Sequence, residues 1–254
     1  MFLSKPGTYA PCGMFNLRHL VLILLTVIGI AVAVKNTNIS RKEDIKKVIR
    51  NSTIVVWVLE ILKIIHIFSI GEASNLNRIV PLYYCSLLLY AGILSSVGKG
   101  KLERIGNVFL ATGGIFAGIA FIIFPSTSLP EFPMFHFRSI HSFFYHGTMI
   151  YVGIIINKYK YIEVQLQDFK YYATIILAIC VPAYIVNAIY GCNLMFISQN
   201  FPGTPISAIY NSTGKLFTPI MVLLQMTLPF FAMQGILQLY KRCDIMQSQE
   251  IREV

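Results

Sequence analysis

The chain has 254 residues, of which 56% are hydrophobic and 13% are charged, and its formal net charge is +10 at pH 7. A soluble domain contains about 25% charged residues, so this composition excludes a soluble globular protein and indicates that most of the surface faces lipid. The positive charge alone would also suit a nucleic-acid-binding protein. However, the Lys and Arg residues form short clusters between apolar runs, which is typical of a membrane protein, and we expect no nucleic-acid partner.

Seven apolar segments are long enough to cross the bilayer, because about 20 helical residues span its hydrocarbon layer. They cover residues 17–34, 52–70, 80–97, 105–124, 139–156, 171–190 and 216–239. Only short loops separate them, so we expect residues 1–254 to form a single integral membrane domain. The sequence thus predicts an all-α fold, a polytopic membrane helical bundle with seven transmembrane helices.

The basic residues predict the orientation of this bundle. Fifteen of the 21 Lys and Arg residues lie on one side, in loops 35–50, 98–104 and 157–170 and in the tail after residue 239, and five lie on the other side. Basic loops remain in the cytoplasm, so we expect the N-terminus outside and the C-terminus in the cytoplasm. The abundance of Lys, Ile and Asn points to the plasma membrane of a low-GC bacterium.

The second segment carries ionisable residues at membrane depth, namely Glu60, Lys63 and, one turn further out, His66. Burying such groups costs several kcal/mol, so each is a functional candidate, and we expect Glu60 and His66 to contact a substrate. Glu60 and Lys63 are three positions apart and face the same way, so a structural pair is the alternative.

The third segment contains Cys85, shortly after Pro81. A single cysteine in a membrane helix is usually a small packing residue, and a nucleophile is the alternative. The five cysteines have no CxxC spacing and are odd in number, which argues against a disulfide framework. A pair between Cys12 and Cys192 is possible if both loops lie outside.

The fifth segment begins with Arg138 and carries His141, Tyr145 and His146. The two histidines are five positions apart, about 140° around a helix, so both cannot point into one narrow site, and His141 shares its face with Tyr145. This spacing lacks the i, i+4 pattern of a helical metal site, and we expect no metal and no cofactor. Arg138 either binds substrate or extends to the lipid headgroups.

The last two segments add polar groups at the same outer end. Pro182 lies inside the sixth segment, where it would kink a helix, and Asn187 and Asn193 follow it. Lys215 precedes the seventh segment. All five histidines also fall in the half of the predicted membrane bundle that faces outward. The sequence therefore predicts a polar cavity open to the outer leaflet.

Three short blocks resemble the signature of the YwaF-type integral membrane proteins, the family that includes human transmembrane protein 164. They are Pro-Leu-Tyr-Tyr-Cys-Ser at residues 81–86, His-Ser-Phe-Phe-Tyr-His at residues 141–146, and Asn187 followed by Gly-Cys-Asn-Leu-Met-Phe at residues 191–196. The resemblance extends from about residue 15 to residue 240. Tyr83 departs from the pattern, because a histidine is expected at that position.

The resemblance implies a seven-helix membrane acyltransferase that acts on phospholipids through a cysteine nucleophile. It places the nucleophile at Cys85 and its histidine partner at His146 or His141. This chemistry is physically reasonable, because a histidine can take the proton of a thiol that attacks an acyl carbonyl.

Other polar residues fit such a site. Arg138 and Lys215 are suited to a lipid phosphate, Asn187 or Asn193 to a developing oxyanion, and Tyr145 to substrate contact. We expect membrane lipids as partners, and the oligomeric state stays open. Two alternatives remain: a small-solute transporter or substrate-binding membrane component that uses Glu60, and a membrane scaffold.

Overall fold

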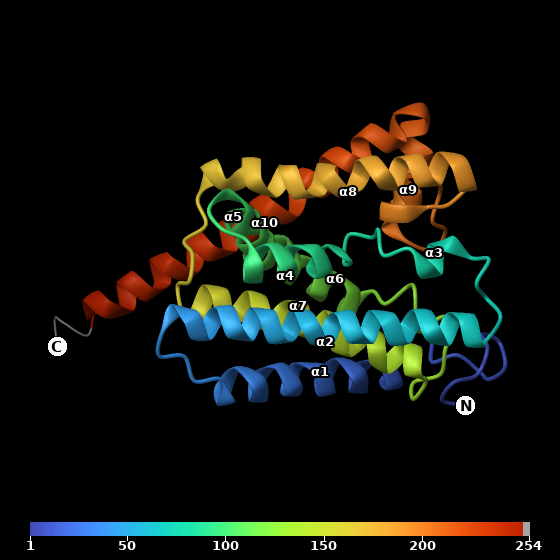
Figure 1. The fold of residues 1–254 in the computed structure, drawn as a ribbon, viewed down its shortest axis with the longest axis horizontal. Helices are drawn as coiled ribbons and strands as arrows, with labels where there is room; N and C mark the ends of the chain where they lie inside the picture. The colour runs from blue at the N-terminus through green and yellow to red at the C-terminus, as the bar shows by residue number, and fades with distance from the viewer. Residues whose placement is uncertain (251–254) are drawn as a thin grey trace.

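The computed structural model describes residues 1–250, with side chains up to residue 240 (Figure 1). All regular secondary structure in this described part is helical, so the predicted helical membrane bundle is confirmed. Arg252 and the side chains of Lys241, Arg242 and Cys243 lie outside the described residues.

Six segments of the described chain are long and apolar enough to cross a membrane. They contain α1 (Leu17–Asn36), α2 (Lys42–Ser69), α5 (Lys101–Phe109) continued through the π-helical turn η1 (Leu110–Gly114) into α6 (Ile115–Ile123), α7 (Phe137–Lys158), η2 (Leu166–Asp168) with α8 (Phe169–Tyr190), and α9 (Pro205–Thr213) continued through η4 (Gly214–Leu216) into α10 (Phe217–Glu250). Shorter elements connect them: α3 (Leu76–Ile79), α4 (Leu87–Val97) and the turn η3 (Leu194–Phe196).

The third predicted span, residues 80–97, differs from the structure. Only α4, eleven residues long, is a regular helix there, and at about 1.5 Å per residue it covers roughly half of the 30 Å hydrocarbon layer. Pro81 prevents a helix from running through residue 81 from the preceding turn, because its ring clashes with that turn and it has no N–H. The irregular stretch 81–86 keeps its polar backbone satisfied inside the protein, since Tyr90 Oη donates to Pro81 O at 3.1 Å.

The helices differ greatly in how much of them the protein buries. The span 101–123 is 72% buried and forms the centre of the bundle, whereas the span of α1 is only 11% buried. Figure 1 shows α1 at the edge of the bundle and α8 with α10 on the opposite side. A Cβ built at Gly106 would lie 2.6 Å from Ser95 N, so α4 and α5 pack backbone to backbone as a hairpin.

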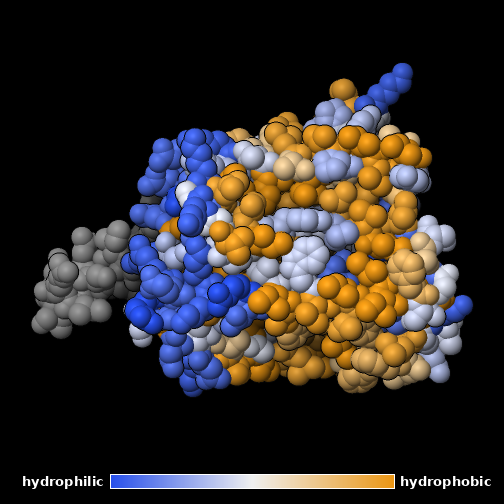
Figure 2. Space-filling model, in the orientation of Figure 1, coloured by the Kyte–Doolittle hydropathy of each residue, from blue (hydrophilic) through white to orange (hydrophobic). Residues whose placement is uncertain are grey.

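The loops fall at two ends of the bundle. Loops 37–41, 98–100 and 159–165 lie together with the C-terminal end of α10, and we call this the basic end (Figure 1). The N-terminus and the loops 70–86, 124–136 and 191–204 lie at the opposite end. Figure 2 shows hydrophilic surface gathered at the basic end and an apolar surface across much of the rest. The alternation of basic loops in the sequence is therefore a real separation in space.

Gly113, in the π-helical turn, provides a test of this central packing. A Cβ at this position would lie 2.7 Å from both Tyr84 Oη and Tyr172 Oη, and these two hydroxyls are hydrogen-bonded to each other. We expect Gly113→Ala to lower the free energy of unfolding by about 1–3 kcal/mol, because the buried pair would have to separate. Thermal unfolding in detergent measures this.

Gly29 is the matched control, because it lies in α1 and a Cβ added there would have no atom within 4 Å. Gly29→Ala should leave stability unchanged or raise it by up to about 1 kcal/mol. Equal melting temperatures for Gly113→Ala and the wild type would contradict the packing described here.

Candidate functional site

The three sequence blocks meet inside the bundle. Met195 N donates to Leu82 O at 3.1 Å, which joins the third block to the first. Tyr145 Oη donates to Cys85 O at 3.4 Å, which joins the second block to the first. Stretches more than 50 residues apart in the chain thus converge on the short irregular segment that carries Cys85.

The loop of the third block is held in an unusual backbone conformation. Met195 and Phe196 have φ angles of 56° and 53°, a left-handed region that costs a non-glycine residue about 1–3 kcal/mol. Gln225 Nε2 fixes this turn by donating to Met195 O at 2.7 Å, and the Phe196 ring lies 5.1 Å from that of Tyr83. The loop is therefore held firmly against the segment 81–86.

The predicted amide ligands Asn187 and Asn193 are engaged in building this loop. Asn187 Nδ2 donates to Leu194 O at 3.0 Å and to Ser198 Oγ at 2.8 Å. Asn193 Oδ1 accepts from Ser198 N at 3.1 Å and from Gln199 N at 3.0 Å. Both side chains shape the loop, and neither donor of the Asn187 amide is left for an oxyanion.

Glu60 and Lys63 of α2 form a direct ion pair. Both are shielded by the protein, with exposed side-chain fractions of 4% and 15%. The pair that the sequence allowed as the alternative for these two residues is therefore formed. The Lys63 ammonium also lies close enough to Cys85 for its charge to act on the thiol, so the pair lies near the first block.

Arg138, in the first turn of α7, brings a second positive charge to this region. Its Nε and Nη1 atoms are buried and have no hydrogen-bond partner among the described residues, and its Cζ lies 5.8 Å from the Phe132 ring centre. The guanidinium is in electrostatic contact with Glu60. Glu60 is already paired, so two buried donors of Arg138 remain available for an anion.

The neighbouring acidic residues do not accept hydrogen bonds from these Arg138 donors, because they form ion pairs with Arg78. Arg78 Nη1 lies 2.7 Å from Glu72 Oε2 and its Nη2 lies 2.8 Å from Glu131 Oε2. This rim network joins the segment after α2 to the loop before α7. The sequence alone did not identify it, since three partly exposed charges in two separate loops carry no motif.

The two histidines of α7 face different surroundings. His146 stacks on Phe121 of α6, with ring centres 3.6 Å apart, and its Nδ1 lies 2.7 Å from Ser142 O. His141 stacks against Tyr145 and is in electrostatic contact with Lys63 and Arg138.

The Nε2 atoms of His141 and His146 are both buried without a partner among the described residues. The two side chains point in different directions around α7, as their spacing predicted, and only His141 faces Lys63 and Arg138. Of the two, His141 is the one placed with the charged groups that surround Cys85.

Cys85 is a free, partly buried thiol. Cys12, Cys180 and Cys192 are free and buried, so the possible disulfide between Cys12 and Cys192 is not formed. In the part of the chain that the structure describes, no three His, Cys, Asp or Glu side chains lie close enough to hold a metal ion.

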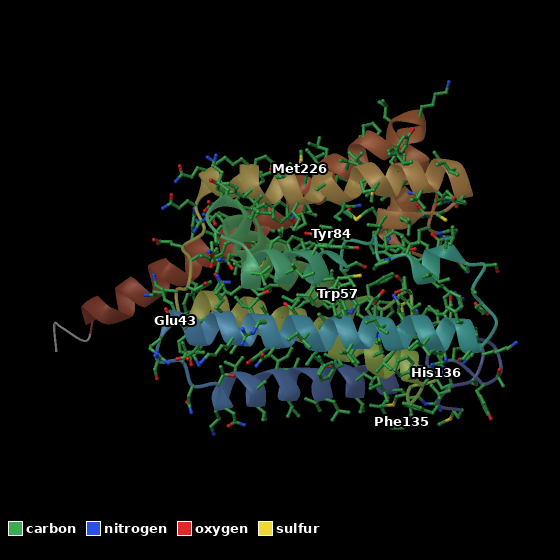
Figure 3. All side chains as sticks on the ribbon, in the orientation of Figure 1. Glu43, Trp57, Tyr84, Phe135, His136 and Met226 are labelled. Atoms are coloured by element: carbon green, nitrogen blue, oxygen red, sulfur yellow. The ribbon has the colours of Figure 1, made fainter. Side chains whose placement is uncertain are left out.

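Three members of the cluster are buried in this conformation. The exposed fractions of Glu60, His141 and Tyr145 are 3%, 7% and 4%, whereas the sequence predicted a cavity open to the outside. The interior is densely filled around Trp57 and Tyr84 (Figure 3). A large substrate would therefore need part of the opposite end to move.

The N-terminal segment covers that end. His66 Nε2 lies 3.4 Å from Leu3 O, and His136 Nε2 lies 3.0 Å from Ser4 O. Phe137 N donates to Phe2 O at 2.9 Å. His66, which we expected to contact substrate, thus contacts this segment, while Lys215 is exposed in η4.

His136 makes this cover sensitive to pH. Its Nδ1 accepts from Arg138 N at 3.0 Å, so the ring caps α7 in its neutral form. Burial lowers the pKa of His136, and the neighbouring His66, Arg138 and N-terminal ammonium lower it further. Its stabilising effect is therefore complete above the unfolded pKa of about 6.5 and declines as the pH falls below that value.

We expect the first 13 residues to become more susceptible to proteolysis and amide exchange between pH 7.5 and pH 5. The variant His136→Asn is the matched control, because Asn can cap a helix but does not titrate. It should remove most of the pH dependence. A wild-type segment equally protected at both pH values would exclude this role of His136.

Comparison with known proteins identifies a family for this chain. Residues 14–235 match the TMEM164 family, and this range contains α2, α4, α7, the Cys85 segment and the loop of the third block. No curated protein and no solved structure gave a significant match. Because the matched range covers most of the chain, the protein belongs to the TMEM164 family.

Proposed function

We propose that the protein is a membrane-embedded lipid acyltransferase in which Cys85 accepts an acyl group from a phospholipid. The observation that carries this proposal is the position of Cys85, a free thiol at the point where the three blocks meet and within electrostatic range of the Lys63 ammonium. We further propose that the protein lies in the plasma membrane of a low-GC bacterium with its basic end in the cytoplasm, since basic loops remain there.

The unused donors of Arg138 favour an anionic ligand. Glu60 faces Lys63 and Arg138 in this cluster, and the nearby rim network of Arg78 with Glu72 and Glu131 carries one net negative charge. A bound phosphate or carboxylate would accept hydrogen bonds from the two buried N–H donors of Arg138 that have no partner among the described residues. A guanidinium with two free N–H donors is well suited to a phosphate oxygen.

The proposed reaction has two steps. In the first, the Cys85 thiol loses its proton to His141 Nε2, and Sγ attacks the ester carbonyl of the lipid. The carbon–sulfur bond forms, the ester carbon–oxygen bond breaks, and the leaving alkoxide takes the proton. In the second step, an acceptor hydroxyl attacks the thioester, gives its proton to His141, and forms a new ester while the thiolate is reprotonated.

Two features support this assignment of roles. His141 Nε2 is buried without a partner among the described residues, so it is free to accept a proton, and His141 and Cys85 are both in electrostatic contact with Lys63. The ammonium of Lys63 would stabilise the thiolate during attack. His146, stacked on Phe121, is better suited to a structural role.

The test is to detect the acyl-enzyme. Purified protein in vesicles of phosphatidylethanolamine and phosphatidylglycerol, both carrying isotope-labelled acyl chains, should acquire one labelled acyl group that hydroxylamine removes, as expected of a thioester. Peptide mapping should locate it at Cys85. Absence of label after long incubation in both the presence and absence of a lysolipid acceptor would reject the proposal.

A transporter that uses Glu60 as a proton site is the second candidate, because the Glu60–Lys63 pair is buried at membrane depth. It predicts proton-coupled solute uptake that Glu60→Gln abolishes and Cys85→Ser leaves intact. An acyltransferase predicts that Cys85→Ser is the more damaging change.

A further inference from the structure

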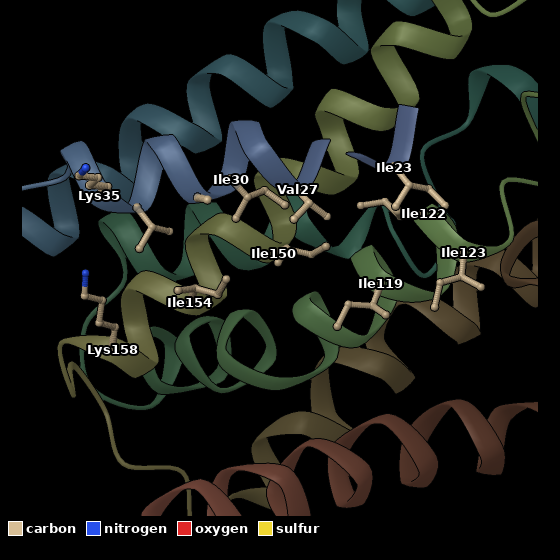
Figure 4. Close-up of a pocket in the computed structure, with 12 residues that line it drawn as sticks. Ile23, Val27, Ile30, Lys35, Ile119, Ile122, Ile123, Ile150, Ile154 and Lys158 are labelled. Carbon is tan, nitrogen blue, oxygen red and sulfur yellow. The ribbon is translucent and has the colours of Figure 1, made fainter. Parts of the chain in front are cut away.

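A groove opens to the lipid between α1, α6 and α7, apart from the Cys85 cluster (Figure 4). Its volume is about 700 Å³, within the usual range for a small-molecule site. The lining residues are Ile23, Val27, Ile30, Ala31, Val34, Lys35, Ile119, Ile122, Ile123, Ile150, Ile154 and Lys158. All are aliphatic except two lysines, which lie together at one end of the groove in Figure 4.

The two lysines are positioned by a fixed framework. Lys35 lies in the last turn of α1 and Lys158 ends α7, both at the basic end. Tyr159 Oη donates to Thr37 O at 2.8 Å, and Tyr151 Oη lies 2.8 Å from Thr37 Oγ1. Neither lysine forms an ion pair among the described residues, and both are exposed.

Towards the other end of the groove, α1 and α6 are in contact. The rings of Phe15 and Phe124 lie 5.6 Å apart, and His19 Nε2 lies 2.9 Å from Ile122 O. The groove follows α1 from Ile23 to Lys35, which at about 1.5 Å per residue is roughly 18 Å. One leaflet of a hydrocarbon layer about 30 Å thick has nearly this depth.

We propose that this groove binds one anionic phospholipid from the leaflet at the basic end. One acyl chain lies along the aliphatic wall, and the phosphate lies between Lys35 and Lys158. The choice of an anionic lipid follows from charge complementarity, because two unneutralised lysines meet an apolar channel of single-leaflet depth. This site is separate from the proposed acyl-transfer site, and neither requires the other.

Native mass spectrometry of the intact protein in detergent tests this assignment, with phosphatidylglycerol and phosphatidylcholine of identical chains as probes. The wild type should retain one phosphatidylglycerol in preference to phosphatidylcholine. The double variant Lys35→Met/Lys158→Met should bind phosphatidylglycerol about 10- to 30-fold more weakly, the effect expected for two lysines near a phosphate. Its binding of phosphatidylcholine should not change.

A matched double variant at the basic end distinguishes binding in the groove from general electrostatic attraction between the protein and anionic lipid. Lys99→Met/Lys101→Met removes the same charge outside the groove, so it should leave phosphatidylglycerol binding unchanged. An equal loss in both double variants, or no loss in Lys35→Met/Lys158→Met, would overturn the proposal. Melting temperatures within a few degrees of the wild type verify that each variant is folded.

Two neighbouring residues of α1 test the channel itself. Ala31 lines the groove, whereas Val32 is exposed outside it. Ala31→Trp should fill the channel and weaken retention of both lipids at least fivefold, and Val32→Trp should have no effect. Unchanged binding in Ala31→Trp would exclude the groove as the site of the acyl chain.

Discussion

Substitution of Cys85 by serine is expected to abolish transfer of acyl groups to the protein, with a loss of at least about 10³-fold in rate. A serine hydroxyl at this position is a far weaker nucleophile than a thiolate, and loss of a covalent nucleophile typically costs several orders of magnitude. The change replaces one sulfur atom with oxygen and should preserve the fold, because the backbone of Cys85 keeps its hydrogen bond from Tyr145 Oη. Thiol-reactive acyl probes and hydroxylamine-sensitive label measure the effect.

Cys192 is the matched control for this experiment. It is a free cysteine in the loop of the third block, and its side chain is in electrostatic contact with Tyr83, as is that of Cys85. Cys192→Ser should therefore retain at least half of the wild-type label. Label that persists in Cys85→Ser and disappears in Cys192→Ser would move the nucleophile to Cys192 and exclude the assignment made here.

Arg138→Met is expected to weaken binding of an anionic lipid headgroup about 10- to 100-fold while leaving the protein as stable as the wild type or more stable. The affinity falls because charge-assisted hydrogen bonds are lost, each worth about 1.5–3 kcal/mol. The stability does not fall, because Nε and Nη1 have no partner among the described residues to lose and an apolar side chain removes the cost of burying the guanidinium. Replacements of this kind can stabilise a protein by about 1–4 kcal/mol.

Arg104 is the control for the stability measurement, because it is a paired arginine. Its Nε donates to Asp168 Oδ1 at 3.0 Å and its Nη2 donates to Glu163 O at 2.8 Å. Arg104→Met would leave the Asp168 carboxylate, only 5% exposed, without its cation. We expect a loss of about 2–4 kcal/mol with no change in lipid affinity, and a similar destabilisation in Arg138→Met would show that Arg138 is structural.

The N-terminal segment, which covers the end opposite the basic end, affects how a lipid would reach Arg138. The N-terminal segment lies over His66 and His136. His136 lies two residues before Arg138 in the chain. Lipid binding at Arg138 would therefore require this segment to shift. The acid sensitivity of His136 offers a way to observe the shift without a substrate.

The sequence predicted most of the long membrane helices correctly, because their formation depends on the lipid environment and not on packing between helices. Apolar runs of about 20 residues predict helices, because in lipid the backbone N–H and C=O groups find no water and must form hydrogen bonds within the segment. The third segment was the exception, because hydropathy alone does not register that Pro81 and the polar contacts of the segment 81–86 interrupt a helix. That irregular backbone is stabilised by hydrogen bonds from Tyr90, Tyr145 and Met195, which are distant in the chain or follow the segment.

The structure shows the surroundings of the candidate residues, and the sequence indicated only some of them. The cost of burying charge identified Glu60, Lys63 and Arg138, and the five-residue spacing separated His141 from His146 around α7. The sequence did not indicate that Asn187 and Asn193 would be taken up by their own loop, or that His66 would meet the N-terminal segment. These contacts join residues that are distant in the chain or depend on loop geometry.

The amino-acid order was enough to establish that this chain is a helical membrane protein, where its basic loops gather, and which polar residues lie at membrane depth. Those properties follow from length, hydropathy and charge, which each segment carries independently of the others. The packed bundle was needed to show which polar groups are satisfied, which are left with unused donors, and where α1 leaves a groove. Those properties depend on distances between helices, and no segment contains that information alone.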